Sequence, residues 1–523
     1  MIKFIQNKSV VWYLAIILSI VSIFTFKLYL DNGLGLSYND ARSHLDIGRR
    51  VVEGLKPGLA QLGSVWLPLD HVLMIPLVWN DWAWHSGFAG AFWNMLSYVG
   101  IGVLIYKYLE KLKVGMVGRL FGVFVFASNL NILYLQSTAM TEPLLLFTML
   151  AGCYYLMIWM TEDRLLDLIK ASFWVMMSTL VRYDGWFLLA VVAGLVALRT
   201  WYKKGYKTAE GTLILFCTVA AFGVVLWFGW NLLIFKDPLY FAFGPYSAHA
   251  QQEQMLAAGA LPTKGNAVLS LQTYLYSMIY NSIATVAFLG IIATFVLWFD
   301  KKLDGAARLA SSALWAPFGF NIIALIFGFS VIFIQGISGN TWFNVRYGVM
   351  LMPTLAIFIG YFVHRFKDFR WVIIGLFMFV SFIAFTSNDS VSIDDARVGS
   401  SQKNVSEVSG WLEKNAKDKP GFIMISAASH DAIIFSSNLP MKKFIHEGTG
   451  AYWESAAIAP DRWARWIVMR THDVNDSTFK FVGVAPGFTK YDLVDSYPFA
   501  DIYQLRDEYL PDLNTTPVYG RQK

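Results

Sequence analysis

Cysteine and charge are both scarce in this chain of 523 residues. The two cysteines, Cys153 and Cys217, lie inside apolar runs, so we expect neither a disulfide framework nor a thiolate metal cluster. Charged residues make up 15 % of the chain, whereas soluble domains contain about a quarter. The sequence also has no Walker loop, no GxGxxG motif, no DxD motif and no basic tail. These absences argue against an ordinary soluble enzyme and against nucleic-acid binding.

Apolar residues, by contrast, make up 56 % of the chain, with 20 Trp, 25 Tyr and 41 Phe among them. A membrane-spanning helix needs about 20 mostly apolar residues, and nine stretches approach that length: 10–28, 88–106, 114–135, 144–160, 211–235, 274–299, 309–334, 346–363 and 371–386. Two shorter runs, 171–181 and 186–198, flank a polar Arg-Tyr-Asp-Gly sequence and predict two short or broken helices. The predicted fold is therefore an α-helical polytopic membrane protein with about 11 transmembrane helices.

Basic residues predict the orientation of the chain. The first apolar stretch follows two lysines, but it is long and lacks a small-residue cleavage site, which favours an uncleaved anchor over a signal peptide. With the N-terminus in the cytoplasm, most of the lysines and arginines before residue 388 fall on the inner side, as the positive-inside rule requires. An odd number of spans then places the C-terminal region on the outer side of the membrane. We expect this membrane to be the cell or plasma membrane.

Two domains follow from this topology: a membrane domain over 1–387, with a long first outer loop over 29–87, and an outer domain over 388–523. The outer domain contains short apolar runs at 422–425 and 466–469, which predict a small α/β fold. All inner connections are short, so no cytoplasmic domain is available for a nucleotide. Any chemistry is expected on the outer side or in the membrane.

Asp40 stands at the start of a helix that the apolar spacing predicts over 37–52, an amphipathic helix along the outer interface. Two interpretations of Asp40 remain open. In the first, Ser37 and Asp40 form a variant of the capping box that closes the helix N-terminus. In the second, Asp40 is a base at the rim of the membrane, kept ionised by the helix N-terminus.

Further charged residues lie at the outer ends of apolar stretches: Glu142, the pair Arg182 and Asp184, and Arg346. Charges at membrane depth are costly and often functional. A structural ion pair is the alternative for Arg182 and Asp184, and extension toward the interface is the alternative for Arg346. Together, two arginines could hold a phosphate in a bidentate way while a carboxylate takes a proton from an attacking hydroxyl.

At these residues the sequence resembles the GT-C glycosyltransferases, in particular the branch of the protein O-mannosyltransferases and the lipid A aminoarabinose transferases. The resemblance extends over residues 1 to about 387. Its motifs are short and occur in the family's order, namely YNDARSH at Asp40, GSVWLPLDH in the first loop, TEPL at Glu142, RYDGW at Arg182 and VRYG at Arg346.

The resemblance implies an inverting transferase that takes a sugar from a polyprenyl-phosphate donor and passes it to a glycan, lipid or protein acceptor outside the membrane. Asp40 would be the catalytic base, and Glu142 would assist catalysis by binding acceptor or donor. Arg182 and Arg346 would bind the donor phosphate and stabilise it as a leaving group. The substrate pocket would include His44, Trp66, His71, Asp184 and Tyr347.

The chain departs from the O-mannosyltransferases at Ala41, which follows Asp40 where they have a second acid, and this argues against paired carboxylates at that point. No cofactor is implied, and although a divalent metal is possible, the scattered acids and histidines support no metal site. Two alternatives share the predicted fold: a transporter or flippase of lipid-linked sugars, against which the lack of an internal repeat argues, and a catalytically inactive accessory scaffold.

Overall fold

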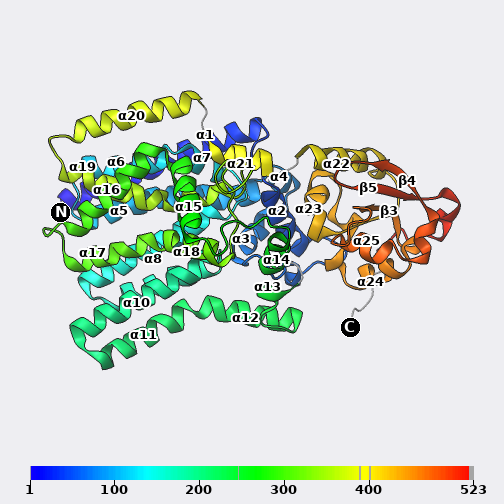
Figure 1. The fold of residues 1–523 in the computed structure, drawn as a ribbon, viewed down its shortest axis with the longest axis horizontal. Helices are drawn as coiled ribbons and strands as arrows, with labels where there is room; N and C mark the ends of the chain where they lie inside the picture. The colour runs from blue at the N-terminus through cyan, green and yellow to red at the C-terminus, as the bar shows by residue number, and fades with distance from the viewer. Residues whose placement is uncertain (1, 245–246, 388–389, 400–401, 518–523) are drawn as a thin grey trace. The chain divides into compact units, whose positions relative to one another are not determined.

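The computed structural model describes residues 2–244, 247–387, 390–399 and 402–517. These residues form two compact units (Figure 1). The first unit comprises Met1–Gly35, Ser64–Asp70 and Gly90–Gly399, and the second comprises Leu36–Gly63, His71–Ala89 and Ser400–Lys523. Most of the first loop therefore groups with the C-terminal segment. The predicted division of the chain falls on residues 388 and 389, which lie outside the described residues, and it stays a prediction.

The first unit is built from helices. In chain order they are α1 (Ile2–Asp31), α5 (Phe88–Lys111), α6 (Met116–Ala127), α7 (Leu130–Leu135), α8 (Glu142–Glu162), α9 (Leu165–Thr179), α10 (Asp184–Lys204), α11 (Tyr206–Ala220), α12 (Phe222–Phe235), α13 (Tyr240–Phe243), α14 (Ala248–Ala257), α15 (Ala267–Ser282), α16 (Ala284–Phe299), α17 (Gly305–Ser311), α18 (Ala316–Phe327), α19 (Met352–Arg365), α20 (Arg370–Ser387) and α21 (Val391–Gly399). Two 3-10 helices, η2 (Ser312–Trp315) and η3 (Val345–Leu351), interrupt the later part.

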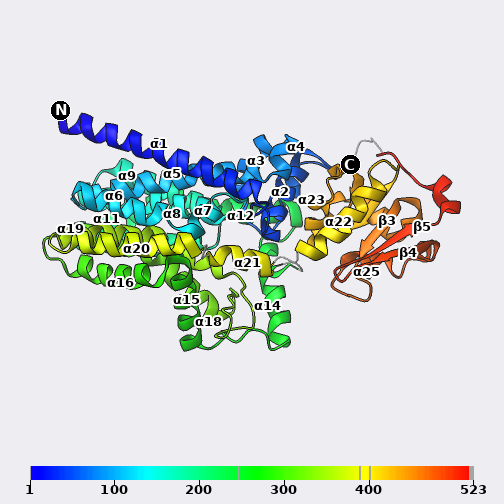
Figure 2. The ribbon, with the colours of Figure 1, turned by 90° about the horizontal axis from the view of Figure 1, so that it is seen from above.

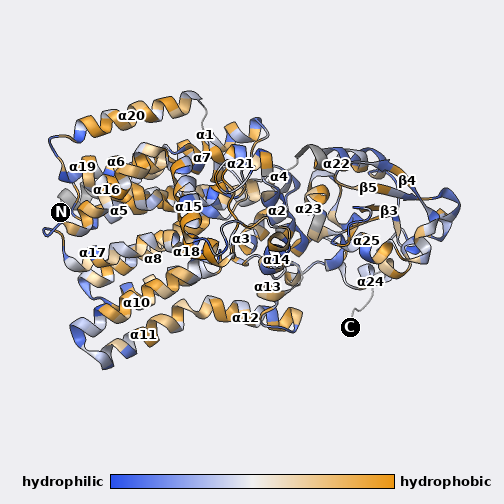
Figure 3. Ribbon diagram, in the orientation of Figure 1, coloured by the Kyte–Doolittle hydropathy of each residue, from blue (hydrophilic) through white to orange (hydrophobic). Residues whose placement is uncertain are grey.

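Among the described residues, seven helical segments are long and apolar enough to cross a membrane, and the number rises to nine if each of two bent helix pairs is one span. The bent pairs are α11 with α12, at 45°, and α15 with α16, at 112°. Apolar residues dominate helices such as α16 and α20 (Figure 3). Many of their large apolar side chains are exposed, among them Phe288, Phe295, Trp371 and Phe382, as contact with lipid requires. The polytopic α-helical fold is thus confirmed, whereas the expected number of about 11 spans is not.

One reason for the different count is the stretch 114–135, which we expected to form a single span. The structure divides it into α6 and α7, because Asn129 between them caps α7 through its side chain, which accepts a hydrogen bond from the Ile132 backbone N–H. The two runs around Arg182, in contrast, form the separate helices α9 and α10, as predicted. Helix α19 packs between α6 and α16, and α20 lies beside α19 (Figure 2).

The second unit contains α2 (Asn39–Val52), the 3-10 helix η1 (Leu59–Leu62), most of α3 (Leu69–Val78) and α4 (Asp81–His85) from the first loop. Its C-terminal part contains α22 (Gln402–Ala416), β1 (Phe422–Ile425), α23 (Ala427–Ser436), β2 (Phe444–Ile445), α24 (Ala451–Ile458), β3 (Ala464–Met469), α25 (Ser477–Val482), β4 (Tyr491–Ser496) and β5 (Asp501–Leu505).

The five strands form one sheet in the order β2-β1-β3-β5-β4. Strands β2, β1 and β3 are parallel, with Ile423 opposite Phe444 on one side and opposite Trp466 on the other. Strands β5 and β4 extend the sheet in antiparallel fashion. All four residues of β1 are buried, which is typical of a parallel strand covered on both faces. The predicted α/β fold of this segment is therefore confirmed.

Helix α2 begins at Asn39, with Tyr38 as an N-cap residue that makes no side-chain capping bond. The capping box of Ser37 and Asp40 stays a prediction. Every residue from Ala41 to Arg49 is buried. The polar face that we expected to lie toward water therefore packs inside the second unit.

Candidate active site

Glu142 is the centre of a charged cluster in the first unit. It lies in the first turn of α8, and Pro143, which follows it, suits the start of a helix. Its side chain is fully buried, and its Oε1 accepts hydrogen bonds from Arg182 Nη1 at 3.3 Å and from Arg346 Nε at 3.1 Å. One carboxylate oxygen therefore faces two guanidinium groups that come from distant parts of the chain.

Arg182 lies between α9 and α10, where the helices reverse direction. Its Nε lies 3.3 Å from Asp184 Oδ2, and its Nη1 donates to Thr141 Oγ1 at 3.2 Å. The turn is tight because Gly185 packs on the end of α9, where a Cβ atom at residue 185 would lie 2.3 Å from the Ser178 carbonyl. Glycine at this position allows Arg182 and Asp184 to lie side by side.

Arg346 lies on η3 and is 4 % exposed. Its Nη1 lies 3.8 Å from Asp395 Oδ2, and its backbone N–H donates to the same carboxylate. The ring of Tyr347 contacts both guanidinium groups, with its centroid 4.6 Å from Arg182 Cζ and 5.2 Å from Arg346 Cζ. These contacts offset part of the cost of burying two cations.

A cluster of buried amides and hydroxyls holds η3 in place. Asn281 at the end of α15 donates to the Val345 carbonyl at 2.6 Å, and its own carbonyl accepts from Asn129 and Asn131. The backbone at Ile283 has a φ of +72°, where α15 bends sharply into α16. Because these groups satisfy the backbone at the bend, the segment that carries Arg346 is fixed.

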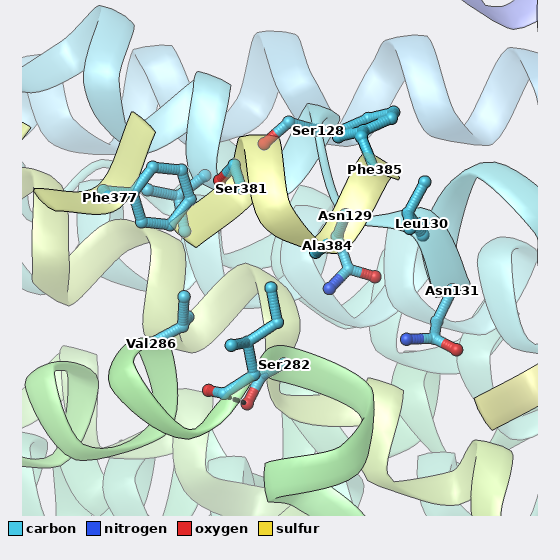
Figure 4. A pocket seen from close by; sticks show the side chains of 12 residues that line it. Ser128, Asn129, Leu130, Asn131, Ser282, Val286, Phe377, Ser381, Ala384 and Phe385 are labelled. Atoms are coloured by element: carbon cyan, nitrogen blue, oxygen red, sulfur yellow. Dashed lines mark hydrogen bonds between the residues drawn. The ribbon is translucent and has the colours of Figure 1, made fainter. Parts of the chain in front are cut away.

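Figure 4 shows Asn129, Asn131 and Ser282 around a small cavity beside this bend, with Phe377 and Ser381 of α20 on another side. The cavity has a volume of about 20 Å³, which is room for about one water-sized group. We therefore regard the amide cluster as a support of η3 and not as a substrate site.

Asp70 is a further carboxylate of the first unit, at the start of α3. It is 1 % exposed, and within the described part of the chain neither of its carboxylate oxygens has a hydrogen-bond partner. Burial raises the pKa of Asp70, and the carboxylate of Glu142 acts in the same direction. A protonated Asp70 would avoid placing one more negative charge beside Glu142.

The predicted site residues fall into two groups. Glu142, Arg182, Asp184, Arg346 and Tyr347 come together in the first unit, and Trp66, which is 37 % exposed, belongs to the same unit. Asp40, His44 and His71 belong to the second unit, where His44 Nδ1 and His71 Nε2 lie 2.8 Å apart and both rings are buried. Among the described residues, no group of three or more His, Cys, Asp or Glu side chains is placed to hold a metal ion.

No protein-family model matches the sequence, and the comparison with curated proteins finds no relative. Solved structures do match. ArnT from Cupriavidus metallidurans bound to undecaprenyl phosphate has a TM-score of 0.60 at 10 % identity, over 94 % of this chain and 98 % of that chain. The oligosaccharyltransferase of Archaeoglobus fulgidus, in complex with Zn and sulfate, has a TM-score of 0.52 at 10 % identity, over 93 % and 72 %. The chain has the same fold as these two proteins.

Within this fold, the sequence motifs identified Glu142, the two arginines that meet at it and the carboxylate of Asp184 beside them. Asp395 and Asp70 were missed as members of the cluster. Asp395 lies in α21, in a segment that the hydropathy pattern placed in the C-terminal domain. Asp70 lies in the GSVWLPLDH motif, but nothing in the spacing of that motif distinguished its carboxylate from an interfacial residue.

Proposed function

We propose that the chain is an inverting glycosyltransferase that moves a sugar from a polyprenyl-phosphate donor to an acceptor hydroxyl on the outer face of the membrane. The observation that carries this proposal is the pair of guanidinium groups that converges on Glu142 in a GT-C fold. Arginine pairs hold phosphate oxygens well because their N–H groups match the anion in geometry and charge. The undecaprenyl phosphate in the ArnT structure supports the donor class.

Glu142 keeps the two guanidinium groups together and so assists catalysis. A guanidinium carries five N–H donors, and the bonds of Arg182 to Glu142, Thr141 and Asp184 use its Nε and Nη1. In this proposal the donor phosphate shares the arginines with Glu142 and does not displace it. The arginines then stabilise the phosphate as it leaves.

Asp40 is the general base of the proposed reaction. The acceptor hydroxyl gives its proton to the Asp40 carboxylate while its oxygen forms a bond to the anomeric carbon of the sugar. The bond between that carbon and the phosphate oxygen breaks, and the polyprenyl phosphate leaves with the electron pair. One such displacement inverts the configuration at the anomeric carbon. His44, Trp66, His71, Asp184 and Tyr347 complete the proposed substrate pocket.

The proposal is tested with the purified protein in nanodiscs, supplied with radiolabelled polyprenyl-phosphate sugars one at a time and a membrane extract as the source of acceptor. We expect transfer from one lipid-linked sugar, with release of polyprenyl phosphate. Scrambling of the labelled lipid between the leaflets of reconstituted vesicles, without transfer, would identify a flippase. Binding of the lipid with neither transfer nor scrambling would identify an accessory protein.

The phosphate-binding role is tested by Arg346→Gln. Loss of a charged hydrogen-bond donor costs about 1.5 to 3 kcal/mol, so we expect the Kd for the lipid donor to rise about 10-fold to 100-fold. The matched control is Arg164→Gln, because the Arg164 side chain is 59 % exposed and pairs with Asp167 and with Glu162, which lies at the opposite end of α8 from Glu142. Equal donor affinity of the two variants would contradict the role of Arg346.

A further inference from the structure

Asp431 in the C-terminal segment contacts the helix of the first loop that carries Asp40. Its Oδ1 accepts a hydrogen bond from Ser43 Oγ at 2.7 Å, and its Oδ2 lies 3.3 Å from Arg50 Nη2. All these residues belong to the second unit, in which α2 packs against α23 (Figures 1 and 2). One carboxylate thus holds α2 at two points, one in each half of the helix.

The contacts of Asp431 lie on the same side of α2 as Asp40. Residues 40, 43, 47 and 50 follow the three-and-four spacing of one helix face. Burial raises the pKa of Asp431; Arg50 and Ser43 lower it, and the carboxylate of Asp40 raises it further. Asp40 is therefore close enough to Asp431 to interact with it electrostatically.

Asp431 is itself held firmly. It follows His430, whose backbone departs from helical geometry inside α23, with φ at −138°. The ring of His430 is fully buried, and its Nε2 lies 2.8 Å from Asp476 Oδ2. Asp476 in turn caps α25 through the backbone N–H groups of Thr478 and Phe479. The Asp431 carboxylate is thus presented to α2 from the interior of the α/β fold.

The contacts between the first loop and the α/β fold lie near the carboxyl ends of the parallel strands. In open sheets with parallel strands, ligands bind beyond the carboxyl ends of the strands, where neighbouring connections leave in opposite directions. Here β1 lies between β2 and β3, so this position is at the carboxyl end of β1, next to α23. The first loop lies there. It contacts Asp431 through α2, and Gln61 Nε2 donates to the Gly448 carbonyl after β2 at 2.7 Å.

We propose that the α/β domain holds helix α2 in place, and that Asp431 is a positioning residue that sets the position of Asp40 through Ser43 and Arg50. This inference rests on the proposed function, in which Asp40 is the base. It gives the C-terminal domain a role in turnover that requires no contact between that domain and the substrate. The loop itself occupies the position where a separate α/β domain would bind a ligand.

The test compares Asp431→Ala with Asp431→Asn in the full-length protein. Misplacing a catalytic group by about 1 Å can cost a factor of about 100, so Asp431→Ala should lower kcat about 10-fold to 100-fold without changing the Kd for the lipid donor. Asp431→Asn keeps an oxygen that accepts from Ser43 and should lose less. Ser43→Ala in the Asp431→Ala background should cost little more, because the two side chains act through one contact. The control is Asp418→Asn, since Asp418 is exposed.

A second readout is amide hydrogen exchange, which does not depend on activity. Asp431→Ala should speed exchange in residues 39–52 and leave α8 and α10 unchanged. Unchanged exchange in 39–52, or faster exchange there with wild-type kcat, would overturn the inference. If Asp431→Ala loosens 39–52 and lowers kcat while Asp40→Asn retains full turnover, the assignment of Asp40 as the base fails, whereas the role of the α/β domain in holding α2 stands.

Discussion

Single residues in both units illustrate how buried charge is handled in this protein. Glu142 is buried against two guanidinium groups, so its charge is compensated by direct ion pairs. Asp46 on α2 is also fully buried, but burial raises the pKa of its carboxyl, and the carboxylate of Asp431 acts in the same direction. Arg50 and Arg42 oppose that shift. Glu142 is thus stabilised by ion pairs with its partners, whereas burial favours the neutral form of Asp46.

The raised pKa of Asp46 predicts a pH-dependent effect of Asp46→Asn. The folded protein holds the Asp46 proton more tightly than the unfolded chain does. Protonation of Asp46 therefore contributes its full stabilisation of the folded state below the ordinary carboxyl pKa of about 4. This contribution is lost as the pH rises toward the raised pKa of the folded state. Asparagine resembles the protonated acid at every pH. We therefore expect Asp46→Asn to raise Tm by about 2 °C or more at pH 7.5, and to have little effect near pH 4.

Thermal unfolding of both proteins in the same detergent, from pH 4 to pH 8, measures this difference. Titration of all other groups is common to the two proteins and cancels in the comparison. A variant that is less stable than the wild type by the same amount at every pH would show that Asp46 is charged and paired in the folded state.

At the scale of elements, the site depends on helix ends. Glu142 starts α8 and Asp184 starts α10, Arg182 lies in the turn before α10, and Arg346 lies on the short η3. Sequence reasoning located these points because a charge at the edge of an apolar run is conspicuous. It did not foresee the bend between α15 and α16, because the stretch 274–299 contains no charged residue and no proline, and the short polar pair Asn281 and Ser282 before Ile283 did not distinguish it from a continuous span. The bend is specified by tertiary hydrogen bonds of Asn281.

Two glycines of α10 provide a matched pair for the turn that carries Arg182. A Cβ at Gly185 would lie 2.3 Å from the backbone of Ser178, whereas a Cβ at Gly194 would meet nothing within 4 Å. We expect Gly185→Ala to push α10 away from α9, to lower Tm and to weaken donor binding at least about 10-fold. Gly194→Ala should preserve both, because alanine favours the helix.

Donor affinity and Tm of the two glycine variants are measured side by side. If Gly185→Ala binds donor as well as Gly194→Ala does, the turn tolerates the added methyl group and the position of Arg182 does not depend on it.

At the scale of the whole molecule, the fold was predictable and the grouping of its parts was not. Hydropathy is sufficient to identify apolar spans and an α/β segment, since both follow from local patterns. The grouping of the first loop with the C-terminal segment depends on pairs such as Ser43 with Asp431, which are 388 residues apart. Sequence reasoning expected no second acid beside Asp40 because Ala41 follows it. The structure brings Asp431, from the C-terminal segment, to the helix that carries Asp40, where it contacts Ser43 and Arg50.

The central claim is that Asp40 is the base of a transferase that uses a polyprenyl-phosphate sugar. The most direct measurement is the turnover of Asp40→Asn in nanodiscs, with the Kd for the lipid donor measured on the same preparation. Asp31→Asn is the control, because Asp31 is an exposed acid at the end of α1. We predict a fall in turnover of about 100-fold or more with donor affinity unchanged. Turnover equal to that of Asp31→Asn would contradict the account.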